Sequence, residues 1–253
     1  MRWVFAALLL VVFAAGYTYR SPLYMAALGA KRYALDRVPC PAQTSRTMVA
    51  LTFGQSNAGN SGEYRHRAKK NVINFYRGHC FVAQDPLLGS DGVHGSVWGL
   101  MGDTLSDRFD YVILIPAAVG SVTVQDWNRR LSTRFKERAT QPYHITHFLW
   151  HQGEANWHTD PTDYARELRA LAATAGRLAN APFFVSVATI CQNGPDAAIE
   201  NAQRSVVDGQ RILPGPDTDT LLPQDRKDGC HFSKLGQEKV ALMWANAIVR
   251  ASP

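Results

Sequence analysis

The 253-residue sequence contains no internal repeat, no low-complexity segment and only four cysteines. No two of these cysteines are close together, which argues against a zinc knuckle. There is no basic helix or RNA-binding aromatic pattern, and the formal net charge is only +6, so nucleic acid is not an expected partner. Hydrophobic residues make up 46% of the chain, which excludes global disorder and allows a sizeable core.

Residues 3–17 form an apolar run without any charge. Its length lies between that of a signal-peptide core and that of a minimal membrane span. Ala14 and Gly16 would suit cleavage, whereas Tyr17 and Tyr19 would suit an interfacial anchor. We expect residues 1–20 to be an uncleaved membrane anchor, with a cleaved signal peptide as the alternative. Residues 21–46 are expected to form a linker.

The cysteines are even in number in a chain that is expected to leave the cytoplasm: Cys40, Cys80, Cys191 and Cys230. We therefore expect two disulfides, for which three pairings are possible. The protein would face an oxidising compartment, on the periplasmic or extracellular side of a membrane, or would be secreted if the N-terminal segment is cleaved.

Residues 47–253 form one expected domain in which continuous apolar runs alternate with amphipathic segments. Continuous apolar runs are typical of strands that are covered on both faces. The expected strands are residues 47–53, 111–116, 145–150, 183–190 and 218–222, and the expected helices are residues 96–109, 161–179, 196–209 and 233–250. This alternation predicts a three-layer α/β/α sandwich with a mainly parallel, flavodoxin-like sheet.

Chemically reactive residues follow the expected strands at the points where these strands end. In a parallel sheet the ligand crevice forms at the carboxyl ends of the strands. Ser56 follows the first expected strand, Gly120 the second, residues 151–154 the third and Cys191 the fourth. Asp228 and His231 lie in the loop before the last helix. We expect all of them at one edge of the sheet.

Ser56, His231 and Asp228 have the chemistry of a nucleophile, its base and the group that orients the base. A serine hydroxyl needs a histidine to take its proton, and a carboxylate can fix the tautomer of that histidine. Attack on an ester also creates an oxyanion, which requires donors already in place. The Ser56 N–H, the N–H near Gly120 and the Gln152 side chain could supply them.

Four segments in order resemble the conserved blocks of the SGNH-hydrolase superfamily and, within it, of sialate O-acetylesterase-like carbohydrate esterases. They are FGQSNAGN, AAVGSVTVQDW, WHQGEAN and DGCHFSKLGQ, and FVAQDPL resembles a further segment between the first two. The resemblance covers nearly all of the chain from residue 47 to about residue 250. It implies the three-layer fold and an esterase that requires no metal or organic cofactor.

The resemblance also implies a role for individual residues. Ser56 would be the nucleophile, His231 the base and Asp228 its orienter, with oxyanion donors at Ser56, Gly120 and Gln152. Glu154 and Asn57 are candidates for substrate binding, although a structural hydrogen bond would explain each of them as well. The sequence departs from the family at Ser121, where a second glycine is common, and at Ala58, where methionine is frequent.

Cys191 and Cys230 are both expected at the edge of the sheet that carries the site. We therefore predict a Cys191–Cys230 disulfide that braces the catalytic loop, and a second disulfide between Cys40 and Cys80. The predicted function is a serine esterase that removes acetyl groups from a carbohydrate. The alternatives are an O-acetyltransferase that acts on an envelope or extracellular polysaccharide, and a non-catalytic carbohydrate-binding module. An intact Ser, His and Asp set argues against the module.

Overall fold

The computed structural model describes residues 37–251. The chain divides into two units, Met1–Val38 and Pro39–Pro253, and the first contributes one described element, strand β1 (Arg37–Val38). The anchor or signal peptide expected over residues 1–20, and residues 21–36 of the expected linker, lie outside the described residues. Within residues 37–251, no helix combines the length and the apolar character that crossing a membrane requires.

The strands of the second unit form one sheet in the order β4-β3-β5-β2-β6-β7-β8. All neighbouring pairs are parallel except β3 and β4, which are antiparallel. The strands are β2 (Thr47–Gly54), β3 (Val72–Tyr76), β4 (His79–Val82), β5 (Tyr111–Pro116), β6 (His147–His151), β7 (Phe183–Val187) and β8 (Ile212–Asp217). The mainly parallel sheet predicted from the sequence is therefore confirmed.

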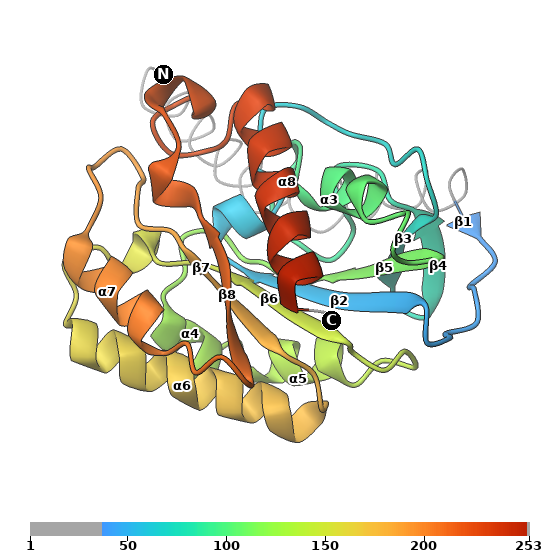
Figure 1. The fold of residues 1–253 in the computed structure, drawn as a ribbon, viewed down its shortest axis with the longest axis horizontal. Coiled ribbons are helices and arrows are strands. Elements are labelled where there is room, and N and C mark those ends of the chain that lie inside the picture. Colours follow the sequence, from blue (N-terminus) through green and yellow to red (C-terminus); the bar gives the residue numbers. More distant parts are fainter. Residues whose placement is uncertain (1–36, 252–253) are drawn as a thin grey trace, which may run out of the picture. The chain divides into compact units, whose positions relative to one another are not determined.

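Helices cover both faces of the sheet (Figure 1). One face carries α3 (Trp98–Thr104) and α8 (Lys234–Ala251), which contact each other. The other face carries α4 (Val124–Asn128), α5 (Ser132–Ala139), α6 (Pro161–Leu178) and α7 (Ala197–Ser205). The three-layer α/β/α architecture is thus confirmed.

Strand β2 lies at the centre of the sheet and is buried along its whole length. Side chains alternate between the two faces of a strand, so a central strand must be apolar on both. Met48 and Ala50 belong to the core cluster under α3 and α8. On the other face, the ring of Phe53 packs against the rings of Trp127 and Phe135 at centroid distances of 5.4 and 5.0 Å. This two-sided packing is why residues 48–53 are apolar apart from Thr52.

The strand predicted at residues 218–222 is wrong. The last strand is instead β8, which ends at Asp217, and the following residues Thr218–Thr220 form a 3₁₀ turn. Pro214 and Pro216 conceal β8 in the sequence, because proline lacks the N–H that a strand normally donates. Proline is tolerated here because β8 is an edge strand, with β7 as its neighbour on one side.

The second unit includes the end of the predicted linker, residues 39–46. Cys40 forms a disulfide with Cys80 of β4, as predicted. The Gln43 side chain donates a hydrogen bond to the carbonyl of His144 at 2.9 Å, and its own carbonyl oxygen accepts from the His144 N–H at the same distance. The last residues before β2 are therefore attached to the domain.

Candidate active site

Strand β2 delivers Ser56 to the carboxyl edge of the sheet through a turn that requires glycine. Gly54 has φ +131°, and a Cβ atom at this position would lie 1.9 Å from the carbonyl oxygen of His151. Beyond it, the Gln55 N–H donates to the same carbonyl at 3.1 Å, and the Gln55 side chain accepts from the Ala155 N–H at 2.9 Å. The chain then enters a 3₁₀ turn, Ser56–Ala58. Ser56, at the start of this turn, is half-buried.

The buried amide of Asn57 connects three distant parts of the sequence. Its Nδ2 donates to Glu154 Oε1 at 2.8 Å and to the carbonyl of Cys230 at 3.2 Å. Asn57 follows Ser56, Glu154 follows strand β6, and Cys230 precedes His231 in the chain. This one side chain therefore holds the serine turn against the loop that carries the histidine. Among the described residues, no hydrogen bond joins Ser56 Oγ to His231, a contact that often tightens only when substrate is bound.

Asp228 and His231 form the hydrogen-bonded pair that the sequence predicted them to form. Asp228 Oδ2 lies 2.8 Å from His231 Nδ1, and Asp228 Oδ1 accepts the N–H groups of Cys230 and His231 at 3.0 and 2.7 Å. Burial by itself raises the pKa of Asp228, but hydrogen bonds from the His231 ring and these N–H groups outweigh it and lower the pKa to about 2. Asp228 is therefore a carboxylate at neutral pH, and its contact with Nδ1 leaves the other ring nitrogen of His231 outside this pair.

A short hairpin holds this pair. Arg226 and Phe232 form an antiparallel bridge, and the Lys227 N–H donates to the His231 carbonyl at 2.8 Å. Cys230 is bonded to Cys191, the residue pairing predicted from the sequence. The Gln192 N–H also donates to the Gly229 carbonyl at 2.9 Å. The loop is thus tied to the segment that follows β7.

Gly120 lies beside open space, since a Cβ atom on it would meet nothing within 4 Å. Its N–H donates to Asp91 Oδ2 over a long distance of 3.4 Å. The next residue, Ser121, has φ +54°, a left-handed conformation that glycine adopts more easily. This conformation would suit the second glycine that the resemblance led us to expect at this position.

The side chain of Gln152 lies inside the protein. It is fully buried, and its Nε2 donates to the Val122 carbonyl at 3.1 Å and to Asn156 Oδ1 at 2.7 Å. Both amide protons therefore have partners inside the protein. The role of Gln152 as an oxyanion donor stays a prediction, and it requires the amide to leave one of these two acceptors. Gly153, the next residue, is needed for close packing, because a Cβ atom there would lie 2.0 Å from the Ala188 carbonyl.

Glu154 and Asn57 lie beneath the surface of the site, with 7% and 3% of each residue exposed. Burial raises the pKa of Glu154 to about 7, although the hydrogen bond from Asn57 opposes this shift. Glu154 Oε1 lies 3.9 Å from His151 Nε2, and burial lowers the pKa of His151 to about 3, so this histidine is neutral. In this geometry Asn57 donates to Glu154 and to the Cys230 carbonyl, so both side chains support the serine turn.

The family of the chain follows from its sequence. A sequence model of carbohydrate esterases, described as sialic acid-specific acetylesterase, matches residues 46–250. The chain belongs to this family. The esterase is accordingly a carboxylic ester hydrolase, as the resemblance implied. A search among curated proteins found no significant match.

Solved structures of low sequence identity share the fold of this esterase. A protein from Arabidopsis thaliana has a TM-score of 0.65 at 16% identity, with 81% of this chain and 98% of that chain covered. The esterase EstA from Pseudoalteromonas sp. has a TM-score of 0.54 at 14% identity, with 81% and 98% covered. A carbohydrate acetylesterase from Xanthomonas citri has a TM-score of 0.53 at 14% identity, with 81% of this chain covered but only 56% of that chain.

Two charged residues of the esterase near the site were missed by sequence reasoning. Asp91 contacts the Gly120 N–H from a loop 29 residues earlier. Arg226 lies buried under the His231 loop. Neither stands at the end of a strand, so the rule that led to the other residues does not find them. Trp127 and Trp150 lie near the strand ends, but both are fully buried core residues.

Proposed function

We propose that this esterase removes O-acetyl groups from a carbohydrate through an acyl-enzyme formed on Ser56. The observation that carries the proposal is the contact of Asn57 with Cys230, which brings the serine turn and the histidine loop together. The ordered His231–Asp228 pair supports it, because it places an ionised carboxylate on the imidazole of the base.

Both half-reactions use the same three side chains. Ser56 Oγ attacks the acetyl carbonyl carbon while its proton passes to the free ring nitrogen of His231. The positive imidazolium is stabilised by Asp228. The tetrahedral intermediate then releases the sugar hydroxyl, which takes the proton from His231, and leaves an acetyl group on Ser56. Water repeats the sequence, releases acetate and restores the serine.

The oxyanion is proposed to accept hydrogen bonds from the N–H groups of Ser56 and Gly120. The Gly120 N–H has a weak partner in Asp91, and an oxyanion would replace that carboxylate as the acceptor. Gln152 is the third proposed donor, subject to the release of its amide described above. Glu154 is proposed to affect substrate binding indirectly, because it accepts the hydrogen bond from Asn57 in the serine turn.

We further propose that the protein is exported and held at the membrane by its N-terminal segment, facing an oxidising compartment. Two disulfides support export, because such bonds persist outside the cytoplasm. Cell fractionation of the full chain tests the anchor. Recovery in the membrane fraction supports it, whereas release of a shortened, soluble protein would indicate a cleaved signal.

The catalytic proposal is tested by acetate release from acetylated glycans and from 4-nitrophenyl acetate. Ser56→Ala is expected to lower kcat by at least about 1,000-fold, since it removes the nucleophile. Ser132→Ala, on α5, is the matched control and should keep full activity. Acetate release by Ser56→Ala at the wild-type rate would falsify the mechanism. Added sugar acceptors in the same assay show whether the acetyl group goes to water or to a second sugar.

A further inference from the structure

Arg226 is a buried arginine directly behind the histidine loop. Its side chain is 4% exposed. Nη1 donates to the Cys230 carbonyl at 2.6 Å and Nη2 donates to the Thr218 carbonyl at 2.9 Å. Its Cζ lies 5.3 Å from the centre of the Phe232 ring. The guanidinium therefore joins the 3₁₀ turn after β8 to the loop that carries His231.

The peptide bond between Cys230 and His231 is held from both sides. Its oxygen accepts hydrogen bonds from Arg226 and from Asn57, and its N–H donates to Asp228 at 2.7 Å. The plane of this peptide places the His231 backbone, and the hydrogen bond from Nδ1 to Asp228 then orients the ring. One of the two donors to the oxygen, Asn57, is also the neighbour of Ser56. The orientation of this peptide therefore relates the base to the nucleophile.

The charge of Arg226 is compensated by nearby carboxylates, of which Asp228 is one. Asp219 Oδ1 lies 3.6 Å from Nη2, and the charge of Glu154 also acts on the guanidinium. Burial lowers the pKa of Arg226, yet an arginine keeps its proton in proteins. A buried charged group is costly, and packed apolar residues often give equal stability. What an apolar residue cannot supply is a rigid fork of donors that fixes two carbonyls at once.

We propose that Arg226 is a positioning residue of this esterase, which orients the Cys230–His231 peptide against Asn57 so that His231 faces Ser56. This inference rests on the proposed function of Ser56 and His231. Arg226 acts through the peptide and does not touch substrate. Its loss should therefore lower kcat and leave KM nearly unchanged, because a displaced base slows acylation without altering the groups that bind the substrate.

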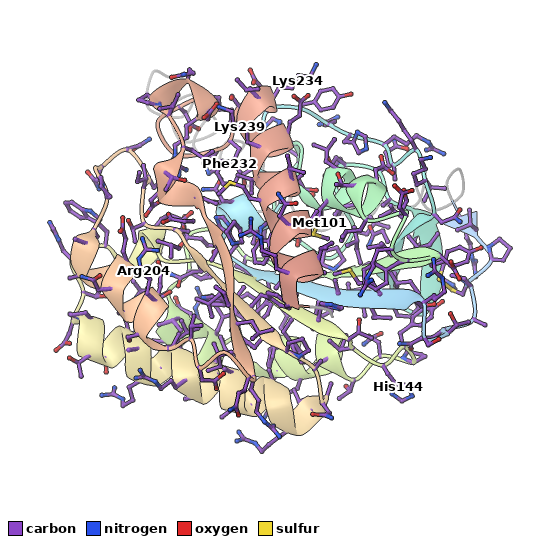
Figure 2. All side chains as sticks on the ribbon, in the orientation of Figure 1. Met101, His144, Arg204, Phe232, Lys234 and Lys239 are labelled. Atoms are coloured by element: carbon purple, nitrogen blue, oxygen red, sulfur yellow. A yellow bond between two sulfur atoms is a disulfide. The ribbon has the colours of Figure 1, made fainter. Side chains whose placement is uncertain are left out.

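The test compares Arg226→Lys and Arg226→Met with Arg204→Met in the full chain. Arg204 lies on α7, away from Phe232 and the histidine loop (Figure 2), and it pairs with Glu200 and Asp217. The rate of 4-nitrophenolate release in a single turnover of 4-nitrophenyl acetate measures acylation of Ser56. Near-UV circular dichroism gives the folded fraction, so each rate is expressed per folded molecule.

We expect Arg226→Met to slow acylation by about 100-fold, as is typical of a misplaced catalytic group. Arg226→Lys keeps the charge but offers one nitrogen in place of the rigid pair that reaches the two carbonyls, and should slow acylation by about tenfold. KM should stay within about twofold in both, and Arg204→Met should match the wild type. Acylation within threefold of the wild type in both Arg226 variants, or a rise in KM with unchanged kcat, would overturn the inference. Ser56→Ala in the same assay distinguishes two failures. If only the role of Arg226 is wrong, Ser56→Ala is still inactive. If the proposed function of Ser56 is wrong, Ser56→Ala stays active.

Discussion

The two disulfides form a matched pair that separates a general effect on stability from a specific effect on catalysis. Cys40–Cys80 joins residues 40 positions apart and Cys191–Cys230 joins residues 39 positions apart. In the loop-entropy description, a loop of this size restricts the unfolded chain by about 13 cal/mol/K, or about 4 kcal/mol at 25 °C. The double variants Cys40→Ala/Cys80→Ala and Cys191→Ala/Cys230→Ala should therefore lose nearly equal unfolding free energy.

Their effects on activity should differ. Cys230 is the neighbour of His231, and its disulfide ties the histidine loop to the segment after β7. The Cys40–Cys80 disulfide lies at β4, on the opposite side of β2 in the strand order from β7. We expect Cys191→Ala/Cys230→Ala to lower kcat by about tenfold or more, because a loosened loop misplaces the base. Cys40→Ala/Cys80→Ala should keep the wild-type kcat.

Urea denaturation at 25 °C gives the two losses of unfolding free energy, and steady-state hydrolysis of 4-nitrophenyl acetate gives kcat at a temperature where both variants are folded. An equal fall of kcat in both variants would refute the special role assigned to the Cys191–Cys230 disulfide. Losses of unfolding free energy that differ by more than about 2 kcal/mol would refute the use of loop length to predict them.

Substitutions at three further positions test two buried side chains and one left-handed backbone conformation. Burial raises the pKa of Glu154 to about 7 from an ordinary value of 4.5, so its contribution to stability is complete below pH 4.5 and is lost as the pH rises to 7. The unfolding free energy of Glu154→Gln should therefore rise by about 3 kcal/mol relative to that of the wild type as the pH goes from 4.5 to 8. Urea denaturation at the two pH values measures this, and a difference that does not change with pH would contradict it. Ser121 has φ +54°, a conformation that glycine adopts easily and valine does not. Thermal melting should therefore show Ser121→Gly to be more stable than the wild type by up to about 1 kcal/mol and Ser121→Val to be less stable. The reverse order of stabilities would contradict this reasoning. Gln152→Ala should lower the unfolding free energy by about 3 kcal/mol in urea denaturation, because it removes the buried hydrogen bonds to Val122 and Asn156. A loss below about 1 kcal/mol would show that these hydrogen bonds matter little.

Much of the fold could be predicted because its signals are local. The central strands β2 and β5 are continuous apolar runs, and their burial on both faces requires that composition. Helix α6 begins where the sequence places it, since the Asp160 side chain accepts the N–H groups of Thr162 and Asp163 and Pro161 occupies the first turn. Strand β8 escaped prediction because its two prolines contradict the usual composition of a strand. Only its position at the edge of the sheet makes them acceptable.

For the candidate site too, some features could be predicted from the sequence and others depend on the tertiary structure. The sequence by itself determined the order of the blocks, the family, and the residue types that could react, because strand ends and short motifs such as Asp228-x-x-His231 are local patterns. Tertiary structure alone decided which hydrogen-bond partners these residues have. Asn57 and Cys230 are 173 positions apart, and no periodicity or composition relates them. Arg226 acquires its place from Thr218 and Cys230, and the Gln152 amide finds its acceptors in neighbouring loops. A buried polar group is defined by what surrounds it, and those surroundings exist only once distant segments have packed together.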